Sequence, residues 1–248
     1  MQKAYYLTYA EDKDWAGKRG LNSDVLIKSL TTMRYHSEAD IYLVLPRDLK
    51  QEVLLELAKL RVKVLRIPEE EWTGRRMFCR LENFYKLMKK QTDGTLLISS
   101  EADVFYLKDP YELFDMGFDL GLGLRPPGSK VSINSSVVFF RKSRDVVDLY
   151  YWLLHQIKRP MWKTYKRYIY RKNSLDNYCD RDIWWAVGES GDEIKEKFNV
   201  NVATFDCGYV MDESIENKKY CFHLKGYTKD RIYEKDFTER ITYGKVKD

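Results

Sequence analysis

The sequence predicts an α/β protein built around a mostly parallel sheet. Short apolar segments alternate with longer segments in which apolar residues recur every three or four positions, an order typical of parallel strand pairing. With 248 residues, 44% of them hydrophobic, the chain is long enough to bury a substantial core. We find no internal repeat or linker, and therefore expect one domain over residues 1–248, with helices flanking the sheet.

The first part of the chain has a regular strand–helix alternation. Residues 3–10 have the composition of a strand with aromatics, and apolar positions 25, 26, 27, 30 and 33 give residues 23–35 the period of a helix. The same criteria predict strand 41–45, helix 48–60, strand 62–67 and helix 77–90.

The second part of the chain continues this pattern less regularly. The predicted elements are strand 95–99, a short helix over 110–114, strands 119–124 and 132–141, helix 145–157, helix 182–189, and strands 200–205 and 219–224. Residues 228–248 are strongly charged, and we expect them to form a tail.

The triplet Glu101-Ala102-Asp103 directly follows an apolar strand. The side chains at i and i+2 do not converge on a regular, extended strand, so both acids reach one cation only where the strand gives way to a turn. Mg²⁺ or Mn²⁺ prefers a few carboxylate oxygens together with phosphate oxygens. The triplet therefore predicts a site for a metal ion and a diphosphate.

Composition excludes several classes of protein. No apolar run reaches the length of a membrane span, and neither GxxxxGK[ST] nor GxGxxG occurs, which argues against P-loop hydrolases and ordinary NAD-binding proteins. The N-terminal residues become acidic too early for a signal peptide. Because no CxxC spacing occurs, we expect reduced thiols in a cytoplasmic protein; the cysteines are Cys79, Cys179, Cys207 and Cys221.

The segment 158–173 is basic and aromatic. From residue 158 to 172 it has seven Lys or Arg and no acid, interleaved with Trp162, Tyr165, Tyr168 and Tyr170. One interpretation is an amphipathic helix that docks through its apolar side. The other is a phosphate-binding surface for nucleic acid or an anionic lipid, in which the contacts come from Lys163, Lys166, Arg167 and Arg171.

Five short motifs, spread over nearly the whole chain, occur in the order expected of one known family. They are Ala10-Glu11-Asp12 with Trp15, Arg80-Leu81, the acid triplet followed by Asp109-Pro110 and Leu113-Phe114, Asn134-Ser135-Ser136-Val137, and His223-x-x-Gly226-x-x-Lys229. In these motifs the chain resembles nucleotide-sugar-dependent glycosyltransferases of the GT-A type. It is most similar to family 8, the group of glycogenin and the lipopolysaccharide galactosyltransferases.

The resemblance implies a GT-A fold with a mostly parallel, Rossmann-like sheet, and transfer of a sugar from a nucleotide-diphosphate sugar, expected to be a UDP-sugar. It implies that Mn²⁺ or Mg²⁺ is bound by Glu101, Asp103 and His223. It also assigns donor contacts to Tyr9, Ala10, Trp15, Arg80, Gly226 and Lys229, with the base held by Tyr9 and Trp15. The sugar and the acceptor are expected beside Asn134, Asp180 and Asp182, the last two being general-base candidates.

The chain departs from the family pattern at several positions. Glu101 replaces the first Asp of the metal motif, Ser136 replaces a Gly, and Asp230-Arg231 replaces a Pro-Trp pair. Arg181 stands where many members have a Gln beside the anomeric carbon, and Arg is neither a nucleophile nor a base. Retention or inversion of configuration therefore stays open.

Several alternatives stay open from the sequence. A saccharide or glycolipid acceptor is the default, and a hydroxylated DNA base is the alternative suggested by the basic segment. A non-catalytic sugar-nucleotide-binding protein would explain Glu101 and Arg181. A nucleotidyltransferase would use the loop 17–20, which the His223 motif disfavours. Structural roles are also open: Arg80 paired with Glu82, and Asp180 or Asp182 capping a helix over 183–187.

Overall fold

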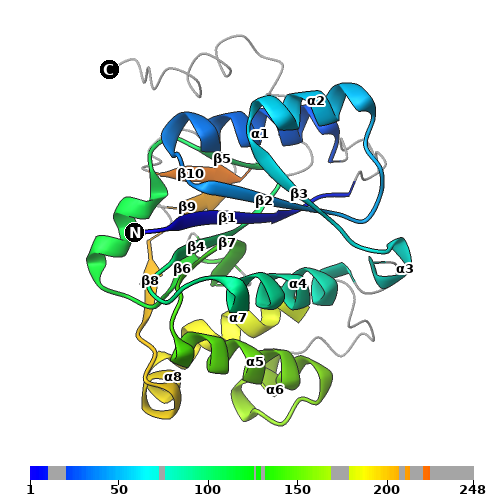
Figure 1. Ribbon diagram of the computed structural model, residues 1–248. Coiled ribbons are helices and arrows are strands. Elements are labelled where there is room, and N and C mark those ends of the chain that lie inside the picture. The colour runs from blue at the N-terminus through cyan, green and yellow to red at the C-terminus, as the bar shows by residue number, and fades with distance from the viewer. Residues whose placement is uncertain are drawn as a thin grey trace.

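A computed structural model of the chain describes residues 1–10, 21–72, 76–125, 127–129, 132–168, 179–206, 210–212 and 220–223. Its centre is a seven-stranded sheet of order β3-β2-β1-β4-β7-β6-β8 (Figure 1). The strands are β1 (Lys3–Thr8), β2 (Asp40–Leu45), β3 (Val62–Arg66), β4 (Leu96–Glu101), β6 (Leu120–Leu124), β7 (Ile133–Arg141) and β8 (Val202–Phe205). Only β7 runs against the others, so the expected mostly parallel sheet is confirmed.

Helices cover both faces of this sheet (Figure 1). On one face lie α1 (Ser23–His36), α2 (Gln51–Lys59) and the 3₁₀ helix η1 (Pro110–Met116). On the other lie α4 (Arg76–Lys90), α5 (Arg144–Lys158), α6 (Lys163–Tyr168), α7 (Cys179–Glu189) and α8 (Gly191–Phe198). A short helix, α3 (Glu69–Trp72), precedes α4.

The alternation of side chains along β1 accounts for this layered arrangement. Tyr5 and Leu7 belong to the buried cluster that includes α1, whereas Ala4 and Tyr6 belong to the cluster that includes α4 and α5. A central strand buried on both faces reads as a continuous apolar run, as residues 4–7 do. The thiols of Cys79 and Cys221 are buried and form no disulfide.

A second, three-stranded sheet of order β5-β10-β9 lies beside the first. It consists of β5 (Val104–Tyr106), β10 (Cys221–His223) and β9 (Val210–Asp212). β10 runs antiparallel to β5, with His223 in register with Val104. This pairing brings the C-terminal part of the chain to the residues that follow the acid triplet.

The predicted helix over 182–189 begins earlier than expected, at Cys179. Asp180 and Asp182 therefore lie within the first turn of α7, and the interpretation that they cap a helix over 183–187 is wrong. Within the described residues, no helix is both long and apolar enough to cross a membrane.

Candidate metal and donor site

The carboxyl ends of β1 and β4 meet at one edge of the large sheet. Their parallel register pairs Thr8 with Glu101, the last residue of β4. Ala102 and Asp103 then form a turn before β5 begins at Val104. Since the turn replaces strand geometry directly after Glu101, the two carboxylates are directed to the same region, as the sequence predicted.

His223 joins these acids through the pairing of β10 with β5. Its Nε2 atom lies 3.1 Å from Oε2 of Glu101 and 3.1 Å from Oδ1 of Asp103. One ligand atom from each of the three residues lies within 4.8 Å of the others. The structure thus brings together the three residues that the resemblance assigned to the metal.

The spacing of these atoms fits a divalent cation. Adjacent ligands of an octahedral ion, at about 2.1 Å from the metal, are separated by about 3 Å. The separations of His223 from each carboxylate match this value without movement. The Glu101 side chain is 28% exposed, against 10% for Asp103 and 12% for His223, so the group opens on the side of Glu101. The longer side chain of Glu101 is compatible with the metal group.

Arg80 of α4 faces the same acid. It is buried, and its Nη1 atom lies 3.2 Å from Oε1 of Glu101. The hydroxyl of Tyr6 donates a 3.0 Å hydrogen bond to the backbone carbonyl of Arg80, which fixes this turn of α4 against β1. Arg80 is thus paired with Glu101, while Glu82 lies 3.5 Å from the Nζ atom of Lys158.

Asn134 lies in an irregular part of β7 next to β4. The register with β6 shifts from Leu122 opposite Val138 to Gly123 opposite Asn134, which inserts extra residues into β7. The Oδ1 atom of Asn134 accepts hydrogen bonds from the amide (3.0 Å) and the hydroxyl (2.5 Å) of Ser136. The hydroxyl of Ser136 therefore bonds within the irregular part of β7 beside Glu101, because its neighbour Val137 pairs with Ser100.

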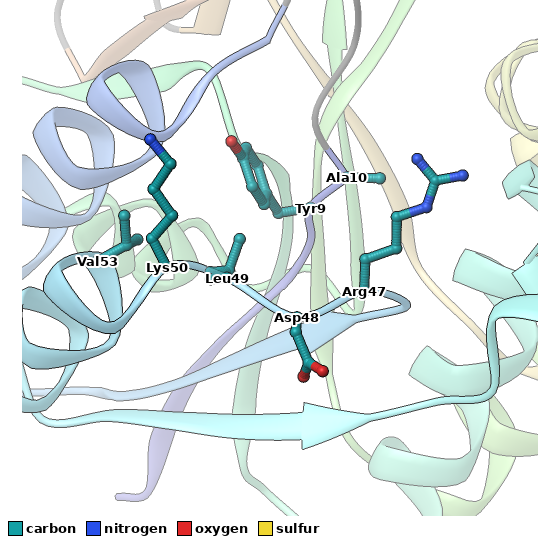
Figure 2. Close-up of a pocket in the computed structure, with 7 residues that line it drawn as sticks. All are labelled: Tyr9, Ala10, Arg47, Asp48, Leu49, Lys50 and Val53. Carbon is teal, nitrogen blue, oxygen red and sulfur yellow. The ribbon is translucent and has the colours of Figure 1, made fainter.

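A small cavity of about 110 Å³ lies beyond the ends of β1 and β2 (Figure 2). Its lining residues are Tyr9, Ala10, Arg47, Asp48, Leu49, Lys50 and Val53. Whole-ligand pockets are usually about 300–1,000 Å³, so this cavity matches one ring of a ligand at most. Tyr9 is buried, and its amide donates to the carbonyl of Val44 (3.0 Å), so its ring is part of the wall.

The loop after β2 supplies two cations that sequence reasoning missed. Arg47 and Lys50 line the same cavity as Tyr9 and Ala10 (Figure 2). Their position in the sequence could have indicated a binding role. They follow the predicted strand 41–45, and ligands of parallel sheets bind beyond the carboxyl ends of the strands. A phosphate or ribose bound between β1 and β2 would meet these side chains.

Asp182 is buried in α7, with its Oδ1 atom 3.3 Å from Nη2 of Arg181. The backbone of Asp180 lies in the same helix, but its side chain is outside the described part of the structure. The remaining candidate residues also lie outside the described residues: Trp15, the loop 17–20, Arg171, Gly226, Lys229 and the tail 228–248.

The basic segment contains α6, and its two kinds of side chain are separated. Trp162 and Tyr165 are buried in the core with α5 and α7, whereas Lys163, Lys166 and Arg167 are exposed. The expectation of an amphipathic helix docked through its apolar side is met as far as residue 167. These two aromatic rings are core residues rather than an exposed stacking surface.

No family model and no curated protein matches the chain. Solved structures with the same fold include the apo form of mouse xyloside xylosyltransferase 1, with 14% identity, 92% of this chain and 98% of that chain covered, and a TM-score of 0.59. The galactosyltransferase LgtC, in complex with donor and acceptor sugar analogues, has 13% identity, coverages of 98% and 94%, and a TM-score of 0.57.

A glycosyltransferase involved in the glycosylation of the major capsid of PBCV-1 has the same fold. It has 10% identity, covers 97% of this chain and 98% of its own, and has a TM-score of 0.56. These structures confirm the GT-A fold predicted from the motifs, the fold of a large class of glycosyltransferases.

Proposed function

We propose that the chain is a metal-dependent glycosyltransferase of the family 8 type. It transfers a sugar from a nucleotide-diphosphate sugar, of which a UDP-sugar is the first candidate, to a hydroxyl of a saccharide or glycolipid. The observation that carries the proposal is the group formed by Glu101, Asp103 and His223 at the carboxyl edge of the sheet. Ligands of open α/β sheets bind at this edge.

In this proposal Glu101, Asp103 and His223 would hold Mn²⁺ or Mg²⁺, which would supply Lewis-acid stabilisation of the charge on the departing nucleoside diphosphate. Arg80 steadies Glu101 and offers N–H groups to the donor sugar or a phosphate. Arg47 and Lys50 contact the nucleoside end of the donor from the loop after β2. Gly226 and Lys229 are proposed to complete the diphosphate contacts.

The acceptor side of the site is proposed to involve Asn134 and the start of α7. Asn134 is held by Ser136 next to the last residues of β4 and is proposed to contact the transferred sugar. Asp180 or Asp182 then receives the proton of the attacking hydroxyl as general base. Arg181 provides no base, so analysis of the product must determine whether the anomeric configuration is retained or inverted.

A donor panel tests the proposal. Thermal shifts with a set of nucleotide sugars and Mn²⁺ should show one preferred donor, and that donor should be hydrolysed in the presence of Mn²⁺ but not after addition of EDTA. Hydrolysis unaffected by EDTA would contradict the metal-dependent mechanism. If the protein binds one preferred donor but neither hydrolyses it nor transfers its sugar to any class of acceptor, the result would favour a non-catalytic binding protein.

A further inference from the structure

The segment from Lys158 to Arg167, which we call the basic ridge, comprises the end of α5, the connection that follows it and most of α6. It contains five Lys or Arg and no Asp or Glu. Near its centre lies Met161, a residue that is 76% exposed and that follows the exposed Pro160. Met161 is the one large apolar side chain of the ridge that is exposed.

The ridge is fixed by hydrogen bonds to side chains of α5 and α8. The Oε1 atom of Gln156 accepts hydrogen bonds from the amides of Met161 (3.0 Å) and Trp162 (2.8 Å). The indole of Trp162 donates to Oε1 of Glu193 (3.1 Å), and its ring lies 5.0 Å from that of Trp152. The exposure of Met161 is therefore imposed by a well-bonded backbone, and is not the result of a frayed helix end.

The ridge lies on the same side of the molecule as the proposed donor site. Because β7 runs against the other strands, α5 starts at the opposite edge of the sheet and returns towards the carboxyl ends of β1 and β4 (Figure 1). The Nζ atom of Lys158 lies 3.5 Å from Glu82 and 4.9 Å from the ring centroid of Phe78, both on the helix that carries Arg80. A surface that met the ridge would also lie near the opening of the site.

We propose that the basic ridge docks the protein on an anionic lipid membrane, with Met161 entering the interface. Near an anionic bilayer each Lys or Arg strengthens binding by roughly fivefold, and an apolar residue adds a contribution that depends on burial among acyl chains. Single-stranded nucleic acid would instead require exposed rings for stacking, but Trp162 and Tyr165 of the ridge are buried. Resting on the proposed function, this inference narrows the acceptor to a membrane-borne glycolipid.

Vesicle flotation of the full chain tests the inference. Phosphatidylcholine vesicles with and without about 30% phosphatidylglycerol are compared at low and high salt, since screening weakens charge attraction. The wild-type protein should bind only the anionic vesicles, and less at high salt. The variant K163Q/K166Q/R167Q should bind roughly a hundredfold more weakly, and Met161→Ser should weaken binding several-fold.

The variant K59Q/R61Q/K63Q is the matched control, because it removes three exposed positive charges on the opposite helical layer and at the edge strand β3. It should bind anionic vesicles like the wild type. Absence of wild-type binding at low salt, an equal loss in the control, or unchanged binding of Met161→Ser would overturn the inference. Tighter binding to a short DNA duplex than to the vesicles would overturn it in favour of nucleic acid.

Vesicle flotation tests the membrane surface and donor hydrolysis tests the proposed function, so a negative result in one assay does not imply a negative result in the other. Flotation needs neither donor nor metal, whereas hydrolysis of a soluble donor needs no vesicle. Binding to vesicles without donor hydrolysis would reject the proposed function alone, and hydrolysis without vesicle binding would reject the membrane surface alone. Thermal midpoints of each variant establish that a loss of binding is not a loss of folding.

Discussion

The Nε2 atom of His223 lies 3.1 Å from Oδ1 of Asp103, although β10 and the turn after β4 come from distant parts of the chain. The contact depends on the antiparallel pairing of His223 with Val104, the residue after Asp103. The candidate metal group is therefore complete only when the C-terminal segment has docked on β5.

Replacing Asp103 by Asn should reduce metal-dependent donor hydrolysis by at least about a hundredfold, because a charged ligand is lost while the size of the side chain is kept. The rate is measured over a titration of Mn²⁺, and part of the loss should be recovered at high metal concentration. Asp115→Asn, at an exposed position of η1, is the control and should behave as the wild type. Equal rates for both variants would reject the role of Asp103.

Arg80→Lys keeps the positive charge near Glu101 but removes the planar fork of donors. We expect the KM for the donor to rise about tenfold, with a smaller change in kcat, because the guanidinium hydrogen bonds that position Glu101 are lost. Arg144→Lys changes an exposed pair with Asp148 and should leave both constants unchanged. A fall in kcat alone would indicate that Arg80 acts in the transition state instead.

Gly121 has no room for a side chain. A Cβ atom there would lie 2.6 Å from the ring of Phe205 and 2.8 Å from the ring of Phe118, both buried. Gly121→Ala should therefore lower the free energy of unfolding by about 1–3 kcal/mol in urea denaturation. Gly191→Ala, where the nearest atom would lie 3.6 Å away, should lower it far less.

Burial lowers the pKa of His36, at the end of α1, and the nearby Asp109 carboxylate only partly offsets this effect. The unfolded chain then binds a proton at higher pH than the folded chain, so the free energy of unfolding decreases as the pH falls through about 6.5 and below. Between pH 7.5 and 5.5 the wild type should lose more stability than His36→Gln, as measured by urea denaturation. His155→Gln, at an exposed position of α5, should lose as much as the wild type.

The long elements were predictable because their apolar periodicity is strong, as in the continuous run of β1 and the helical spacing of α5. The strands β5 and β9 have three residues each, too few for a period, and α8 has a single buried residue, Ile194. These elements depend on tertiary pairing, and the predicted elements did not include them.

Within the site, the turn at Glu101 and Asp103 followed from the residues themselves, whereas His223 came only from the family resemblance. The contact between Arg80 and Glu101 was not predicted, because it depends on how α4 packs against the sheet. The bulge at Asn134 was also missed, since it arises from the register between β6 and β7 and from the hydroxyl of Ser136.

Mn²⁺ binding in the presence of a nucleoside diphosphate tests the central claim most directly. Titration followed by electron paramagnetic resonance should show that UDP strengthens Mn²⁺ binding to the wild type, and that His223→Gln weakens it at least about tenfold. His155→Gln should bind as the wild type does. Equal Mn²⁺ affinity in the wild type, His223→Gln and Asp103→Asn would contradict the account.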